Sequence, residues 1–274
     1  MPLGLFEREV LGVLAAYRTA ESFVAGGSVI HQAPASPRCS RDVEIFHDEL
    51  ESARMAMEGD AAALGELGYE VETLVKPPAM FQGIVRRGAS KTRIDWVVDS
   101  AFRFFPPEPD PEFGWRINFW DAATNKLLAL AGRQAARDLL DTLYIHRQHL
   151  HLGALAWAAA GKDPGFSPEG VIDWARRNAR VRPENLDAMV LTHPVDLVVL
   201  KREWLEAAEA AEGLIARLPM EEMGCLYLDP QTLKPTCPEP DKPGFARLIR
   251  HRGQLGGAWP QGSRPASLGP SVSR

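Results

Sequence analysis

The sequence predicts an α+β fold, in which a mixed sheet with flanking helices is followed by a mainly helical second half. Between positions 40 and 98, polar and apolar residues alternate in several short stretches, as they do in half-buried strands. From position 122 onward, apolar residues recur at three- and four-residue steps, which is typical of helices. The Pro- and acid-rich segment PPEPDPEFG separates the two patterns. We therefore expect a core domain over 1–121, a helical domain over 122–252 and a disordered Gly/Ser/Pro-rich tail over 253–274.

The first half alternates between the two kinds of element. Apolar residues at helical spacing predict helices, a strand runs into a glycine pair, and residues rich in Val and Ile predict further strands. The expected helices are 6–23, 29–33 and 47–67. A short strand that runs into a glycine turn is expected over 24–28, and further strands over 40–46, 69–74, 80–86 and 92–98.

In the second half, Pro and Gly punctuate a series of helical segments. The first of these segments, 123–149, has helical spacing throughout, and Gly132 within it leaves open a break into two helices. The expected helices are 123–149, 152–160, 168–179, 183–191, 194–200 and 202–217.

Composition excludes several classes of protein. The 274 residues include 31 basic and 36 acidic side chains, so a net charge of −5 argues against wholesale coating of nucleic acid. The three cysteines are scattered, without a CxxC pair, which predicts free thiols and a cytoplasmic location. Apolar stretches are far shorter than the ~20 residues that a membrane-spanning helix needs.

A glycine turn follows the first predicted strand. Gly26 and Gly27 have no Cβ, so the backbone N–H groups of such a turn can approach phosphate oxygens closely, and Ser28 adds a hydroxyl. The turn is therefore a candidate site for the triphosphate of an NTP.

Two carboxylates follow on the next predicted strand. Asp42 and Glu44 are separated by one residue, so on a strand they point to the same side about 7 Å apart along the chain. Carboxylate oxygens at this spacing suit a hard divalent cation, Mg²⁺ or Mn²⁺. Asp95 lies on a later strand with the same alternation, and three acids would suit a two-metal site for nucleotidyl transfer.

The turn followed by paired acids resembles the core of the polymerase-β-like nucleotidyltransferase superfamily. More narrowly, the chain resembles the AbiEii/AbiGii-type toxin family of nucleotidyltransferases. This resemblance rests on three segments in the family's order and covers about half of the chain, from 22 to 144. The segments are Ser40-Arg41-Asp42-Val43-Glu44, Lys126-Leu127-Leu128-Ala129-Leu130 with Arg133, and Arg137-Asp138-Leu139-Leu140-Asp141. Glu44 stands where the family usually has Asp, and Ser28 where many members have Thr.

The resemblance implies a polymerase-β-like core and roles for residues outside the paired acids. It implies that Lys126 contacts the nucleotide phosphates and that Asp138 or Asp141 completes the catalytic site. It also places four residues at the nucleotide, namely Ser40, Arg41, Arg133 and Arg137. On one straight helix, Asp141 would lie about 60° from Lys126 around the helix axis, and Asp138 about 120° away. This angle favours Asp141 as the acid of the catalytic site, unless the helix breaks at Gly132.

These observations predict a metal-dependent enzyme that transfers a nucleoside monophosphate from an NTP to a hydroxyl group. The resemblance implies a toxin that acts on a tRNA 3′ end and is neutralised by an antitoxin. Two alternatives stay open, a small-molecule nucleotidyltransferase of the aminoglycoside-modifying kind and a catalytically silent binding module. An RNA acceptor requires a local basic patch, for which the candidates are the run 176–182 and the pair of runs 86–87 and 91–93.

Overall fold

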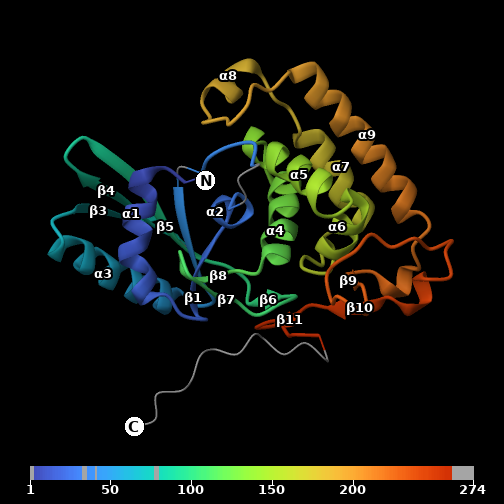
Figure 1. Cartoon of the computed structure of the whole chain (residues 1–274), viewed down its shortest axis with the longest axis horizontal. Helices are drawn as coiled ribbons and strands as arrows, with labels where there is room; N and C mark the ends of the chain where they lie inside the picture. Colours follow the sequence, from blue (N-terminus) through green and yellow to red (C-terminus); the bar gives the residue numbers. More distant parts are fainter. Residues whose placement is uncertain (1–2, 33–35, 41, 77–79, 261–274) are drawn as a thin grey trace, which may run out of the picture.

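A seven-stranded mixed sheet dominates the first half of the computed structural model, which describes residues 3–32, 36–40, 42–76 and 80–260 (Figure 1). The strand order is β3-β4-β5-β2-β1-β8-β7. β2 runs parallel to β5, and β1 pairs in parallel with β8, whereas the other neighbours are antiparallel. The strands are β1 Ser22–Ala25, β2 Asp42–His47, β3 Glu70–Lys76, β4 Met80–Arg87, β5 Ser90–Val98, β7 Glu108–Asp110 and β8 Gly114–Arg116.

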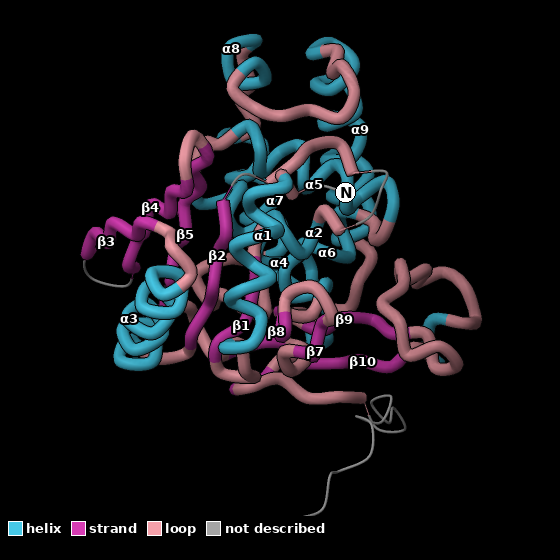
Figure 2. The backbone as a smooth tube through the Cα atoms, turned by 60° about the vertical axis from the view of Figure 1, so that its left-hand side comes forward, coloured by secondary structure: helices cyan, strands magenta, loops and turns pink. Residues whose placement is uncertain are grey.

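Helices α1 (Leu5–Leu14) and α3 (Leu50–Glu66) cover one face of this sheet (Figure 2). The predicted helix over 6–23 is too long. After α1 a short 3-10 turn, Ala15–Tyr17, leads into a turn closed by Thr19 and Ser22, and β1 then pairs with β2. Strand pairing therefore overrides the apolar helical spacing of these last residues.

A buried polar contact fixes α3 against the sheet. Asp60 of α3 pairs with Arg18 and accepts a hydrogen bond of 2.8 Å from Trp96 Nε1 of β5. Both Asp60 and Trp96 are almost completely buried. A buried carboxylate requires such partners, so this contact sets the position of α3 on the sheet.

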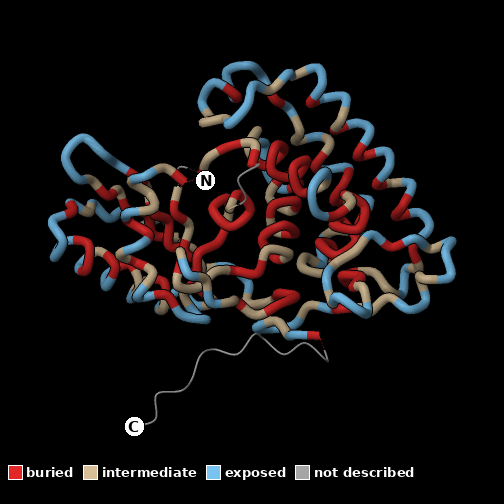
Figure 3. Tube along the Cα trace, viewed as in Figure 1, coloured by how far each residue is buried: buried red, intermediate tan, exposed pale blue. Residues whose placement is uncertain are grey.

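The second half packs helices α4 to α9 beside the other face of the sheet (Figure 1). The side chains Asn118, Ser167 and Asp196 cap the N-termini of α4, α7 and α9. Burial is densest where α2, α4, α5 and α6 meet (Figure 3). The helices are α2 Gly27–Ile30, α4 Phe119–Gly132, α5 Ala136–Gln148, α6 Leu152–Ala159, α7 Pro168–Asn178, α8 Pro183–Asp187 and α9 Leu197–Ile215.

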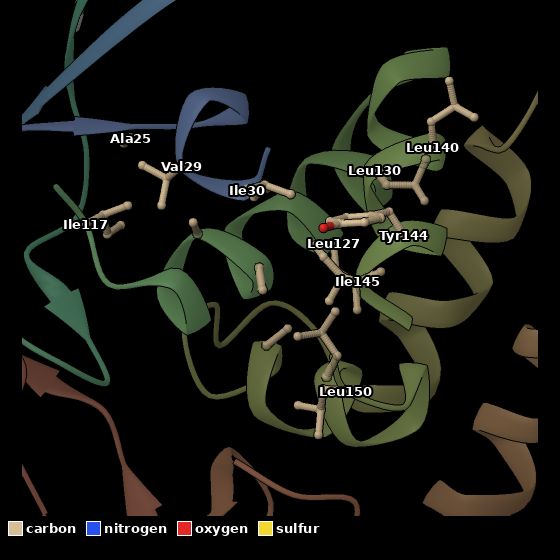
Figure 4. Packing of buried hydrophobic residues seen from close by; sticks show 14 of the residues in the cluster. Ala25, Val29, Ile30, Ile117, Leu127, Leu130, Leu140, Tyr144, Ile145 and Leu150 are labelled. Atoms are coloured by element: carbon tan, nitrogen blue, oxygen red, sulfur yellow. The ribbon is translucent and has the colours of Figure 1, made fainter. Parts of the chain in front are cut away.

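Helix α2 connects the two halves through apolar contacts. Val29 and Ile30 of α2 lie beside Ile117 and the α4 residue Leu127 (Figure 4). All four side chains are buried, so the glycine turn that precedes α2 is held against both the sheet and α4.

Five further predicted helices have different limits in the structure. The segment 123–149 is two helices, because the chain turns between Gly132 and Ala136. The segments 194–200 and 202–217 form the single helix α9, which begins after the Asp196 cap. The expected helix over 183–191 ends at Asp187, and the predicted helix near 29–33 starts earlier, at the glycine turn.

The expected linker and tail also take part in sheets. The segment 105–114 contributes β7 and most of the turn to β8, which extend the main sheet next to β1. Gln254–Leu255 (β11) pairs with Phe102–Arg103 (β6), and His251 bonds to the Phe104 carbonyl at 2.8 Å. Residues 253–260 are therefore ordered, and the rest of the expected tail lies outside the described residues. A further unpredicted pair joins Cys225–Leu228 (β9) with Ile249–Arg252 (β10).

The fold contains a histidine that makes stability depend on pH. His47 of β2 is 1% exposed, and burial together with the Arg18 charge lowers the pKa of its imidazole to about 4. An unfolded histidine titrates near 6.5, so between these values only the unfolded chain takes up the proton. The free energy of unfolding therefore falls as pH drops through this window. We expect the free energy of unfolding to fall less between about pH 7 and about pH 5 in His47→Gln than in the unmutated protein, by about 1–2 kcal/mol. Urea unfolding of both proteins at the two pH values measures this difference. An unchanged pH slope in the variant would contradict this assignment.

The three cysteines are free thiols, as expected. Of the helices that the structure describes, none combines the length and the apolar character required to cross a membrane.

Candidate active site

The paired acids lie on the sheet face that is turned toward the helical half. Alternation along β2 buries Val43 and Ile45 and leaves Asp42 and Glu44 partly exposed on the opposite face. In the parallel register, Glu44 is the partner of Asp95 on β5. The structure thus brings the three predicted acids onto neighbouring positions of one sheet face.

Glu44 packs directly over the glycine turn. Gly26 has φ +70°, and a Cβ built there would lie 1.6 Å from the Glu44 Oε2 atom. The Glu44 carboxylate accepts no hydrogen bond and forms no ion pair with any described residue. The glycine is therefore required both for its backbone conformation and to leave room for this carboxylate.

Replacing Gly26 with alanine is expected to affect both stability and ligand binding. With φ +70° and ψ −147°, Gly26 lies in a region essentially confined to glycine, where a residue with a Cβ costs about 1–3 kcal/mol, and the clash displaces Glu44. Gly68 is a matched control, because its φ is +81° and a Cβ added there would have no neighbouring atom within 4 Å. We expect both variants to lower the free energy of unfolding, Gly26→Ala more strongly because of the added clash, while only Gly26→Ala loses Mg²⁺-dependent NTP binding in a titration. Equal NTP binding by both variants would argue against a role for the turn.

Lys126 of α4 faces the paired acids across a cleft. Its Nζ atom lies 3.0 Å from Asp138 Oδ1 and 3.2 Å from Asp141 Oδ2, both on α5. Burial alone would lower the pKa of Lys126, but the charges of Asp141 and Asp138 raise it above the ordinary lysine value. The ammonium group is therefore charged and fixed in position at the cleft wall.

Asp141 is the centre of a buried ionic network. It is fully buried, and Arg38 donates two hydrogen bonds to its carboxylate, from Nε at 2.7 Å and from Nη2 at 2.6 Å. His31 Nε2 lies 2.8 Å from Asp141 Oδ1. Burial would raise the pKa of Asp141, but the charges of Lys126 and Arg38 hold it well below its ordinary value. Burial lowers the pKa of His31, so its imidazole is neutral in this network at pH 7.

Two cavities meet at Glu44 and Lys126. The first, of about 190 Å³, is lined by polar groups that include Arg38, Ser40 and Asp42. The second, of about 360 Å³, is lined mainly by apolar residues such as Phe46 and Leu128. A nucleotide has a charged end and an aromatic end, so adjoining polar and apolar cavities suit its two parts.

The carboxylates fit a divalent cation in part. Glu44 offers free oxygen atoms, and oxygen is the donor that Mg²⁺ prefers. Asp42 Oδ2 is paired with Arg93 at 2.5 Å, and Asp95 accepts a hydrogen bond from Gln82 and pairs with Arg93. Within the described part of the chain, no three His, Cys, Asp or Glu side chains converge as a metal-binding group. Glu44 and the Oδ1 atom of Asp42 are thus open to a cation at the cleft, whereas Asp42 Oδ2 is also contacted by Arg137 at 3.5 Å.

The other predicted residues divide into two groups. Ser40 and Arg137 line the first cavity, and Arg133 lines the second while it pairs with Asp138 at 2.8 Å. Ser28, by contrast, is 1% exposed, and its hydroxyl donates to the Asp42 carbonyl at 3.4 Å. Arg41 lies outside the described residues.

Asp138 and Asp141 contact Lys126 from behind and line neither of the two cavities. The break after Gly132 removes the angular argument that favoured Asp141, because α4 and α5 are separate helices. Both acids position Lys126, and Asp141 also holds Arg38.

Sequence reasoning missed Arg38 and His31. The partner of both is Asp141, more than 100 positions away, so no local pattern reveals the contact. One signal was present for Arg38. It precedes Ser40, Asp42 and Glu44 at the same two-residue spacing, which in an extended chain places all four on one side.

The chain combines a mixed sheet that carries paired acids with a helix that faces them and carries a lysine, and this fold is similar to that of a solved nucleotidyltransferase. The structure is similar to MenT4, a nucleotidyltransferase toxin from Mycobacterium tuberculosis H37Rv, with a TM-score of 0.53 and 16% sequence identity over 79% of this chain and 84% of MenT4. It is also similar to JHP933 from Helicobacter pylori, with a TM-score of 0.49 and 15% identity over 77% of this chain and 92% of that protein. No protein-family model and no curated protein matches the sequence. The α+β prediction and the resemblance to nucleotidyltransferases are confirmed at the level of the fold.

Proposed function

We propose that the protein is a metal-dependent nucleotidyltransferase. In the reaction, an acceptor hydroxyl oxygen bonds to the α-phosphorus of an NTP, the bond from that phosphorus to pyrophosphate breaks, and the hydroxyl proton passes to solvent. One observation carries the proposal: Asp42 and Glu44 on β2 and Lys126 on α4 line the same cavity within a nucleotidyltransferase fold.

The residues around the cavity take distinct roles in this proposal. Asp42 and Glu44 hold the cation, Mg²⁺ or Mn²⁺, with Asp95 as an assisting acid. A bound divalent cation supplies charge that neutralises the triphosphate and stabilises the in-line transition state. Lys126 binds a phosphate oxygen. Its ammonium group is held in position before the nucleotide binds, because it forms ion pairs with Asp138 and Asp141. Such preorganisation is the main source of electrostatic stabilisation in enzymes.

The cationic side of the first cavity receives the triphosphate. Arg38 and Arg137 line it, and Gly27 and Ser40 leave backbone and hydroxyl groups near the phosphates. Arg133 lines the second cavity, where the nucleoside fits between Phe46 and Leu128. Ser28 supports the turn from beneath through its hydrogen bond to the Asp42 carbonyl.

We further propose that the acceptor is a tRNA 3′ end, that the protein is the toxin of a toxin–antitoxin or phage-defence pair in the cytoplasm, and that a cognate antitoxin protein neutralises it. The support is the resemblance in the motifs, together with a fold similar to that of MenT4, which is described as a toxin.

The test is incubation of the purified protein with total tRNA, Mg²⁺ or Mn²⁺ and each α-labelled NTP, with Asp42→Ala as the control. We expect label on tRNA with the unmutated protein and a loss of at least about 10³-fold in Asp42→Ala, whose circular dichroism and melting temperature stay near those of the parent. Equal labelling by both proteins would overturn the role of Asp42. NTP binding without labelled tRNA would favour a small-molecule acceptor, and the absence of NTP binding would favour a silent binding module.

A further inference from the structure

A basic stripe leads away from the paired acids along the same sheet face. Residues 91, 93 and 95 of β5 alternate onto this face, and the antiparallel register pairs Arg86 with Lys91 across β4 and β5. Arg93 stands next, in register with Asp42. Arg86, Lys91 and Arg93 therefore form a continuous row that ends at the candidate cation site; we call it the basic stripe.

Arg86 and Lys91, the outer part of the basic stripe, are poorly neutralised by the protein itself, whereas Arg93 pairs with Asp42 and Asp95. Arg86 and Lys91 are like charges directly opposite each other, which destabilises an antiparallel pair. Glu72 pairs with Arg86 at 3.0 Å, but both side chains are largely exposed, so the contact is weak. Lys91 is exposed and forms no ion pair with any described residue. An external anion would offset this repulsion.

A groove connects the basic stripe with the active-site cavity. All three basic residues line a cavity of about 490 Å³, together with one acid, Glu7. Cys39, Ser40 and Val190 line both this groove and the first cavity of the active site. The groove and the first cavity therefore adjoin at these residues, where the Cys39 N–H group donates to the Val190 carbonyl at 2.8 Å, and Arg93 lines the groove while it pairs with Asp42.

The other basic run of the sequence has a different environment. Arg176 pairs with Glu212 of α9 at 2.6 Å, and the guanidinium of Arg177 stacks over the Trp174 ring. No arginine of the run 176–182 lines either active-site cavity or the groove. Its charges are thus partly used inside the helical half.

We propose that the basic stripe binds the phosphates of a single-stranded nucleic acid and guides its terminal hydroxyl to Asp42. This inference rests on the proposed nucleotidyltransferase activity and names the surface that selects a polynucleotide acceptor over a small molecule. Arg86 and Lys91 contact phosphates by charge, while Arg93 joins the end of the stripe to the catalytic carboxylates through Asp42 and Asp95.

The test compares two variants that each lose two positive charges, Arg86→Gln/Lys91→Gln and Arg176→Gln/Arg177→Gln. Binding of a mixed-sequence, 5′-fluorescent single-stranded RNA is measured by anisotropy over a salt series. We expect the first variant to bind about tenfold more weakly, with a salt slope smaller by about 0.7 for each lost phosphate contact. The second variant should bind the RNA as the unmutated protein does. Mg²⁺-dependent NTP binding and the melting temperature should be unchanged in both.

Several results would overturn the proposal. A loss of RNA binding confined to Arg176→Gln/Arg177→Gln would place the nucleic acid on α7, and equal RNA binding by all three proteins would exclude both surfaces. Absence of RNA binding by the unmutated protein, with NTP binding intact, would overturn the stripe but leave nucleotidyl transfer to another acceptor standing. Failure to bind NTP would instead count against the proposed function.

Discussion

Asp141→Asn is expected to lower the free energy of unfolding by about 3–5 kcal/mol, the range typical when one partner of a buried ion pair is removed. The substitution keeps the size of the side chain but removes its charge. Arg38 and Lys126 would then lie in the interior without the carboxylate that both of them contact. Urea unfolding of the variant and the unmutated protein measures the difference.

Asp138→Asn is the matched comparison for Asp141→Asn. Asp138 is equally buried, but of its two partners Lys126 keeps Asp141 when this carboxylate is lost, and Arg133 is 52% exposed at the side chain and can be solvated. We expect a smaller loss of stability in this variant. Because the pKa of Asp141 is depressed, its contribution is present above the unfolded value of about 3.9 and is lost as pH falls below that value. An Asp141→Asn protein as stable as the parent at neutral pH would contradict the network described above.

Lys126→Met is expected to reduce nucleotidyl transfer by about 10²–10³-fold, the effect typical of removing one preorganised donor at a reacting oxyanion. Methionine matches the length of lysine but has no charge. Arg38 and Arg133 still contact Asp141 and Asp138, so the acids keep partners and the protein remains folded. Steady-state transfer rates to total tRNA, with NTP binding measured separately, give the size of the effect.

Lys162→Met provides the control for this substitution. Lys162 is also a buried lysine paired with a buried aspartate, at 2.7 Å from Asp121, but it lines neither cavity of the active site. We expect this variant to lose stability while its transfer rate at low temperature stays near that of the parent. A comparable loss of transfer in both variants would mean that Lys126 has a structural role and does not contact the phosphates.

The strands that carry the candidate site were predictable because their signal is local. Alternation in 40–46 and 92–98 reports which residues face the core, and it predicted that Asp42 and Glu44 share one side of their strand and that Asp95 lies on the polar side of another. The register of β2 with β5 then puts the three on one face. The limits of β2 to β5 therefore agree with the structure within a few residues. The helical spacing in 152–160 and 168–179 was equally sufficient for α6 and α7.

The missed features depend on contacts between distant segments. The sequence PPEPDPEFG has the composition of a loop. Part of it nevertheless joins the sheet, because β7 pairs with β8 and β8 pairs with β1. The turn after Gly132 likewise follows from the packing of α5 against α4 and α6 rather than from a helix-breaking proline. Arg38 and His31 became part of the site only through Asp141, whose position requires the whole helical half.

The pairing of β11 with β6 has a consequence for synthesis of the chain. Phe102–Arg103 has no strand partner in β11 until Gln254–Leu255 has left the ribosome, and His251 reaches Phe104 across 147 positions. A nascent or prematurely terminated chain would expose this strand edge, and unpaired edges promote aggregation. Completion of the fold therefore waits for translation of Gln254–Leu255, so a truncated product ending before Gln254 should be directed to proteolysis rather than persist as an active fragment.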